Sequence, residues 1–523
     1  MKKKCVLWLL LLALLPVMLP TESLSARKIA SISYDCCVKN NMPILTRRIF
    51  AAEEIIRTTI FGDVSFVRGE ILILGGLDVL YSEMRTYVEQ HGGKVVGFLE
   101  TANVYQVYFS DSTPEDLYKL LDTFNSNDII ELAVLNVVNV VNNRVSRPIP
   151  GVQRPPLEPI YTHPLGQYVI PENMSWPYQW SMHTINAPRA WVYNDMMASI
   201  NVGVVDFFLQ EYVDTLCISL IETNAPRPYG GHLFSSHRGI HEASIIGNIS
   251  NRTYRDVGLL WNAQLFGYPL LGVTLDTYVS DFVTRRAISL FDIKHAISTL
   301  FAHDVNLINI GMGWEHLNSA GNEFNIYEAS NIALRIERDA LTIFLGAYLS
   351  LGQDFLIVQF AERTPNTSTL FSRELKHLTN VGYSGFFVNI DDDNIKSRII
   401  IVGGMERMGT GKYRLYSSSP IGSRIDVIAP ERNLYAISIA GSRFHSGAST
   451  STPHVTGVAG MVWSINPYLT GAEVKEIIIN NAHEDIMIEV IAGINENGEI
   501  FTEILPVLDA GLAVEAAART LEE

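Results

Sequence analysis

The chain has 523 residues, a formal net charge of -16, a hydrophobic content of 47% and only 18% charged residues. This composition excludes a disordered chain, because it offers enough apolar surface to offset the entropy that is lost on folding. The negative charge argues against a nucleic-acid partner, which would select a basic face. We therefore expect a folded chain of several domains that does not bind nucleic acid.

The amino-terminal residues have the pattern of a secretory signal. Lysines at positions 2–4 precede an apolar run over residues 6–19, and the small residues Ser23, Ser25 and Ala26 follow as cleavage positions. The alternative is an uncleaved anchor, but the run is short for a bilayer span and contains Pro16. We predict a signal peptide over residues 1–26 and a secreted or cell-envelope protein.

A small α+β domain is predicted next. The expected elements are a strand over 70–74, a helix over 78–90, strands over 94–99 and 104–109, a helix over 114–124 and a strand over 129–134. This order is that of a split βαβ, ferredoxin-like domain. Ser112 and Glu115 have the spacing of a capping box for the second helix, and Pro114 suits its first turn. We expect this domain over residues 69–142, after an N-terminal extension over 27–68.

A larger α/β domain follows a proline-rich segment. The prolines between residues 147 and 177 indicate an extended linker, which we place at 143–177. Near-continuous apolar runs then alternate with helical patterns such as residues 292–302, which is typical of a parallel sheet covered by helices. We predict a three-layer domain with a mainly parallel central sheet over residues 178–520. The predicted strands are 200–205, 305–310, 355–360 and 399–403, and ligands should bind beyond their carboxyl ends, at Asp206, Gly311 to Gly313 and Glu362 to Arg363.

One segment carries a family resemblance. Residues 447–457 read GASTSTPHVTG and resemble the serine segment G-T-S-M-A-T-P-H-V-A-G of the subtilisin-like serine proteases, the subtilases. The similarity extends over roughly residues 180–518 and includes VVD up to Asp206 and LINIGMG up to Gly313. It implies a subtilisin-like peptidase domain in which Ser449 is the nucleophile and Asp206 orients the catalytic histidine. It also implies that the ferredoxin-like domain is a propeptide or inhibitor-like domain, docked on the peptidase domain.

The chemistry of Ser449 and Asp206 agrees with these roles. A serine that precedes a helix lies in positive potential, which favours a developing anion. For Ser449 the alternative is a helix-capping serine. Asp206 ends a buried strand, where a carboxylate needs a partner, so the alternative is a structural aspartate.

The expected general base is absent from its position. The family's histidine segment, H-G-T-H-V-A-G-I-I-G, aligns without gaps to residues 238–247, so Arg238 occupies the place of the base. A guanidinium stays protonated and has no acceptor lone pair, so it cannot take the proton of a serine hydroxyl. His237 is one residue upstream, where a helix would turn its side chain away by about 100°. His237 and, more weakly, His445 stay open as displaced bases, and His241 matches the family's second, non-catalytic histidine.

The oxyanion donor is also substituted. The family pattern A-G-N-E aligns to residues 361–364, so Arg363 replaces the amide donor. In this family, loss of the base lowers kcat by about 10⁶, and loss of the oxyanion donor lowers it by about 10² to 10³. Either substitution alone would therefore lower kcat severely. We further expect Arg238 to pair with Asp206 through a fork of charge-assisted hydrogen bonds.

The resemblance still implies polypeptide binding. It assigns Ile310, Gly311, Met312 and Gly313 to a substrate-binding strand that takes up peptides as an added strand. We expect a catalytically impaired pseudoprotease that retains peptide or protein binding. The alternative is an active serine endopeptidase that uses His237 as its base and processes its own pro-domain.

No cofactor is expected, because Cys/His spacing of the metal-binding type is absent from the sequence. Residues 391–394, with the sequence DDDN, allow a calcium-binding loop as an alternative. A solvated acidic turn is the simpler interpretation.

Overall fold

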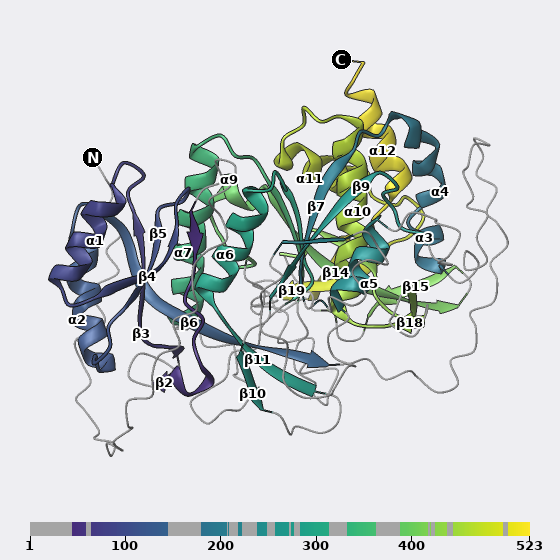
Figure 1. Cartoon of the computed structure of the whole chain (residues 1–523). Helices are drawn as coiled ribbons and strands as arrows, with labels where there is room; N and C mark the ends of the chain where they lie inside the picture. Colours follow the sequence, from purple (N-terminus) through teal and green to yellow (C-terminus); the bar gives the residue numbers. More distant parts are fainter. Residues whose placement is uncertain are drawn as a thin grey trace. The chain divides into compact units, whose positions relative to one another are not determined.

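Two large β-sheets, the first antiparallel and the second mainly parallel, organise the chain in the computed structural model (Figure 1). The first sheet has the strand order β1-β4-β5-β3-β6-β11-β10, with β2 beside β3, and the second has the order β15-β14-β13-β12-β7-β9-β8, with β16 beside β14. All described residues lie in one compact unit. The structure describes residues 44–58, 64–144, 179–206, 208, 218–221, 238–247, 257–270, 273–276, 283–312, 332–361, 387–409, 411–416, 419, 424–436, 443–494 and 500–522.

The predicted element order of the small domain is confirmed. Its four main strands run antiparallel, and α1 and α2 lie together on one side of them (Figure 1). The elements are β1 (Leu45–Thr46), η1 (Ala52–Glu54), β2 (Ile55–Thr58), β3 (Val64–Gly75), α1 (Tyr81–Gln90), β4 (Lys94–Leu99), β5 (Val104–Tyr108), α2 (Pro114–Asn125) and β6 (Ile130–Arg144).

Two local expectations for this domain need correction. The capping box of α2 is formed by Thr113 and Asp116, one residue later than predicted: the Thr113 hydroxyl accepts from the Asp116 amide at 3.2 Å. Pro114 explains the shift, since a proline at the first helical position places the cap at residue 113. The boundary predicted at residue 69 falls inside β3, because β2 (residues 55–58) pairs with residues 64–67 at the start of that strand.

Both faces of β3 are buried, and successive side chains enter different cores. Ile71 and Ile73 pack with α1 and α2, whereas Leu72 and Leu74 pack with residues of α6 (Leu290–Phe301) and α7 (Ile332–Ser350). This alternation follows from the period of two in a strand. The small domain therefore shares an apolar core with helices that flank the second sheet.

Strand pairing and polar contacts extend this junction. From Val138 to Arg144, β6 pairs antiparallel with β11 (Val283–Ser289), which leads directly into α6. The Asn136 side chain accepts a hydrogen bond from the Phe291 amide at 3.1 Å, which satisfies a donor in the first turn of α6. Arg47, next to β1, pairs with Asp292 at 2.9 Å, and both side chains are about one-tenth exposed.

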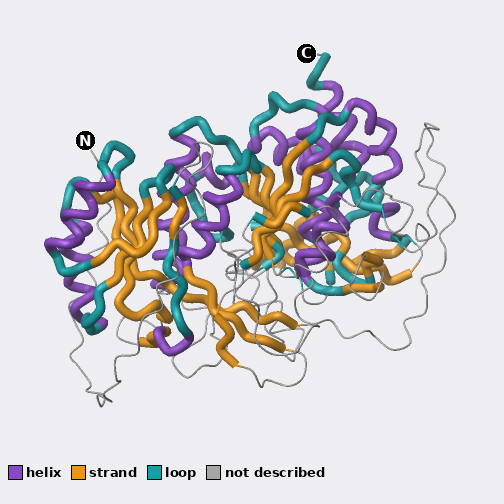
Figure 2. Tube along the Cα trace, in the orientation of Figure 1, coloured by secondary structure: helices purple, strands orange, loops and turns teal. Residues whose placement is uncertain are grey.

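The second sheet confirms the predicted buried parallel arrangement. Strands β7, β9, β12, β13, β14 and β16 pair in parallel, and β15 adds antiparallel to β14. Helices lie on both sides of it (Figure 2), and neighbouring residues such as Ile400 and Ile401 belong to different cores. The strands are β7 (Ile200–Asp206), β8 (Ser219–Leu220), β9 (Ala263–Pro269), β10 (Val273–Asp276), β12 (Leu307–Ile310), β13 (Leu356–Phe360), β14 (Ile399–Gly409), β15 (Lys412–Leu415) and β16 (Val427–Pro430), with β10 belonging to the first sheet.

Helix α10 (Thr452–Ile465) packs closely against the core because two of its residues are glycines. A Cβ atom on Gly457 or Gly460 would come within 2.5 Å of Leu259 or 2.4 Å of Leu260, respectively. The remaining elements are α3 (Trp180–Thr184), α4 (Ala187–Ala190), η3 (Trp191–Met196), α5 (Arg238–Gly247), α9 (Asp393–Lys396), β17 (Leu434–Ala436), β18 (Arg443–His445), η5 (Ala448–Thr450), α11 (Gly471–Asn480), β19 (Ile488–Ile494), β20 (Ile500–Leu505) and α12 (Ala510–Arg519).

The predicted signal over residues 1–26 and the predicted linker, apart from its first two residues at the end of β6, lie outside the described residues. Among the helices that the structure does describe, none combines the length and hydropathy of a bilayer span.

Candidate active site

Asp206 and Arg238 form an ion pair at the carboxyl end of the parallel sheet. Asp206 is the last residue of β7 and is fully buried, and Arg238 is the first residue of α5. The Arg238 Nε lies 3.4 Å from the Asp206 Oδ2. The predicted pairing is therefore confirmed, and it supplies the charge partner that a buried carboxylate requires.

A second nitrogen of the Arg238 guanidinium contacts a different acceptor. Nη2 of Arg238 donates a hydrogen bond to the backbone carbonyl of Gly311, directly after β12. The expected two-armed fork on Asp206 is therefore wrong in its geometry, because one guanidinium spans two acceptors on neighbouring strands. Arg238 thus links the ends of β7 and β12.

A second buried carboxyl group stands beside this pair. Glu242 follows Arg238 by one helical turn and is 1% exposed. Its Oε2 accepts a hydrogen bond from the Asn309 side chain at 2.7 Å, and Asn309 in turn accepts one from the Thr456 hydroxyl at 2.8 Å. Strand β12 and helices α5 and α10 are thereby joined by one polar network.

The glycine at position 311 is required by this network. A Cβ atom there would lie 1.8 Å from the Glu242 Oε1, so a larger residue would displace the buried carboxyl group. Sequence reasoning gave Glu242 no role. Its spacing of four residues from Arg238, which places both on one helix face, is the signal that could have identified it.

Burial is the main cause that raises the pKa of Glu242 well above its ordinary value. The negative charge of Asp206 and a hydrogen bond with it raise this pKa further, while Arg238 and Asn309 lower it. Two adjacent buried carboxyl groups facing one guanidinium therefore favour a state in which Glu242 keeps its proton.

Glu242→Gln should stabilise the protein at neutral pH and flatten the pH dependence of its stability. A raised pKa in the folded state stabilises the fold fully below the unfolded pKa of about 4.3, and this stabilisation is lost as pH rises through the folded pKa. Glutamine copies the protonated form without titrating. Urea unfolding midpoints between pH 5 and 9 measure the effect, and Glu89→Gln, at an exposed glutamate paired with Arg85, is the control. A Glu242→Gln protein less stable than the parent at every pH would show that the native carboxyl group is ionised.

Ser449 lies in η5, just before α10. The next residue fixes this turn: the Thr450 hydroxyl donates to the Glu431 carbonyl at 2.8 Å. Helix α5, which carries Arg238, packs against both η5 and α10. The three aligned segments therefore meet at the carboxyl end of the sheet, although no hydrogen bond joins the half-buried Ser449 hydroxyl to another described residue.

The described histidines of this region contact one another or the backbone. The rings of His241 and His445 are in contact, with centroids 3.5 Å apart and planes tilted by 42°. His454, fully buried in α10, makes a 3.0 Å hydrogen bond with the Thr450 carbonyl, and burial lowers its pKa to about 4. His237 lies outside the described residues.

Two other sequence candidates also lie outside the described residues, namely Arg363 and Gly313. Of the predicted substrate-binding strand, Ile310 ends β12, and Gly311 and Met312 follow it, all buried. The Met312 carbonyl accepts a hydrogen bond from the Gln359 side chain at 3.0 Å.

The acidic turn at residues 391–394 makes contacts within the protein. Asp392 caps α9 by accepting from the Ile395 amide at 3.0 Å, and Asp391 lies 3.5 Å from Arg338. Over the part of the chain that is described, no group of three or more His, Cys, Asp or Glu side chains is placed to hold a metal ion.

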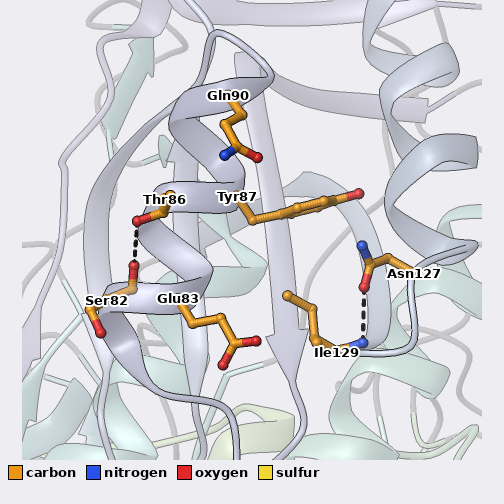
Figure 3. Close-up of a pocket in the computed structure, with 7 residues that line it drawn as sticks. All are labelled: Ser82, Glu83, Thr86, Tyr87, Gln90, Asn127 and Ile129. Carbon is orange, nitrogen blue, oxygen red and sulfur yellow. Dashed lines mark hydrogen bonds between the residues drawn. The ribbon is translucent and has the colours of Figure 1, made fainter.

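An open hollow of about 540 Å³ lies on the small domain, away from these residues (Figure 3). Within it Thr86 donates to the Ser82 carbonyl at 2.7 Å, and the Ile129 amide donates to Asn127 at 3.0 Å. The hollow is lined by Ser82, Glu83, Thr86, Tyr87, Gln90, Asn127 and Ile129.

Known proteins resemble this chain in part of its sequence and in its fold. A family model described as the subtilase family matches residues 364–501. Subtilisin-like protease 1 of Plasmodium berghei (strain Anka) is 33% identical over 85 residues, which are 16% of this chain and 14% of that protein.

A solved structure shares the fold. The crystal structure of fervidolysin from Fervidobacterium pennivorans, a keratinolytic enzyme related to subtilisin, matches with a TM-score of 0.56 and 14% identity, over 90% of this chain and 64% of that chain. The chain thus aligns with less than two thirds of the length of either relative. A model of the subtilase family thus matches part of this chain, and the chain has a subtilisin-like α/β fold.

Proposed function

We propose that this chain is a catalytically impaired subtilase, a secreted pseudoprotease that binds a peptide or protein without turning it over. The observation that supports this most strongly is the position of Arg238. Its guanidinium stands where the family has a general base and is engaged by Asp206 and by the Gly311 carbonyl. A group that holds its protons and has no lone pair cannot activate Ser449.

The proposal includes a small domain that stays docked on the peptidase-like domain, as an inhibitor-like pro-region. Three kinds of contact support this. The β6–β11 ladder extends over residues 138–144, the Asn136 side chain caps α6, and Leu72 and Leu74 share a core with α6 and α7. These contacts would persist if the linker were cut, because none of them depends on an unbroken chain. We propose no cofactor for this function. Binding of a calcium ion is left as an alternative.

The alternative function is an active serine endopeptidase that uses His237 as a displaced base and cuts its own linker. Expression of the whole chain separates the two. We expect the parent chain to remain uncut between Val141 and Trp176. Its pattern on a denaturing gel should therefore be the same as that of its Ser449→Ala variant. Both proteins are first checked for a cooperative unfolding transition. Cleavage in that segment by the parent chain, absent from the folded Ser449→Ala variant, would contradict the pseudoprotease proposal.

A further inference from the structure

We propose that Arg238 also closes the peptide-binding edge beyond β12, so that a peptide backbone gains full access only after this side chain releases the Gly311 carbonyl. Arg238 is then a positioning residue that regulates binding, in addition to replacing the base. This inference rests on the proposed binding function, because it concerns the same strand edge.

The backbone groups of β12 itself are not available to a peptide. Within the strand, Leu307 to Ile310 pair with β7 on one side and with β13 on the other. An added strand must therefore use backbone groups from Gly311 onward, and strand addition requires free carbonyl acceptors as well as amide donors. The Gly311 carbonyl is the first such acceptor.

Two side chains of the protein already occupy the carbonyls in this stretch. Gln359 donates to Met312, and its own carbonyl oxygen accepts from the Phe387 amide at 3.2 Å. Gln359 is fully buried and fixed at both ends, so this contact belongs to the core. Arg238 differs, because its side chain is 20% exposed and can move toward solvent. Of the two donors, Arg238 is the one that a peptide can displace.

The carboxyl groups behind Arg238 keep it in the closing position. Asp206 is fully buried, and Glu242 lies within the same network, so withdrawal of the guanidinium would leave buried negative charge without a cation. The planar fork of arginine reaches Asp206 and Gly311 together. Lysine offers a single charged point and cannot serve both acceptors in the same way. Arg238→Lys should therefore keep the ion pair and release the carbonyl.

The test compares three full-length proteins by fluorescence polarisation with a pool of fluorescein-labelled random hexapeptide amides. We expect Arg238→Lys to bind the pool about tenfold more tightly than the parent, because the peptide no longer displaces a charge-assisted hydrogen bond. The matched control is Arg398→Lys, at an arginine that pairs with Asp354 at the amino end of β14, and its affinity should equal that of the parent.

Each outcome decides a separate point. Equal binding by the parent and Arg238→Lys would overturn the closing role and leave the binding function standing. Absence of binding in all three folded proteins would overturn the binding function and the closing role with it. If Arg238→Lys fails to fold, the double variant Arg238→Met with Glu242→Gln removes the donor together with one carboxyl group and is held to the same expectation.

Discussion

Arg238→His alone should leave the chain without appreciable peptidase activity, even though it returns an imidazole to the position of the base. The imidazole would stand beside Asp206, which ends β7 as the orienting carboxylate requires. The oxyanion position, however, still holds Arg363 according to the family alignment. In subtilisin, loss of the amide donor there lowers kcat by about 10² to 10³.

Adding Arg363→Asn to Arg238→His should therefore raise the rate by about 10² to 10³ over the single variant. Hydrolysis of a chromogenic peptide amide measures both, and the same double variant with Ser449→Ala is the control. Substantial hydrolysis by Arg238→His alone, abolished by Ser449→Ala, would show that the oxyanion site does not limit this chain.

Arg238→Met should destabilise the protein by about 3–5 kcal/mol at neutral pH. The substitution keeps apolar volume but removes the cation that faces Asp206 and Glu242, and removal of one partner of a buried ion pair leaves an uncompensated charge. The free energy of unfolding in urea measures the loss. Arg85→Met is the matched control, and it should leave the free energy of unfolding nearly unchanged because Arg85 and Glu89 are more than half exposed.

Glu242→Gln should recover part of the stability that Arg238→Met loses. Arg238 lowers the pKa of Glu242, so its loss raises this pKa further and increases the cost of keeping Glu242 protonated at neutral pH. Glutamine avoids that cost, so the double variant should be more stable than the sum of the single effects predicts. Strict additivity would mean that Glu242 and Arg238 do not interact, contrary to their places in one buried network.

Motifs with fixed spacing predicted the site best. The gap-free alignment over residues 238–247 predicted that Arg238 would lie beside Asp206, and the two side chains form an ion pair. The prediction succeeded because the fold fixes where β7 ends and where α5 begins. The contact with Gly311 could not be foreseen, since it joins residues 73 positions apart in the sequence and depends on where a long side chain points. Nor could the sequence show that Gln359 occupies the Met312 carbonyl.

The strand ends were predicted less well than the strands themselves. β3 and β6 extend beyond the apolar runs that identified them, because β2 and β11 supply hydrogen-bond partners for the additional residues. Such pairing depends on distant parts of the chain and outweighs local propensity. The helix starts depended on local rules, and the error of one residue at Thr113 arose because two neighbouring pairs both fitted the capping-box spacing.

Labelling of Ser449 by a serine-directed phosphonate, read by the intact mass of the folded protein, tests most directly whether this serine can act as a nucleophile. A hydroxyl without a base beside it should give no mass increase, and the parent chain and Ser449→Ala should have spectra that differ only by the substituted oxygen atom. Stoichiometric labelling of the parent that is lost in Ser449→Ala would show that a base reaches Ser449, and the chain would then be an active peptidase.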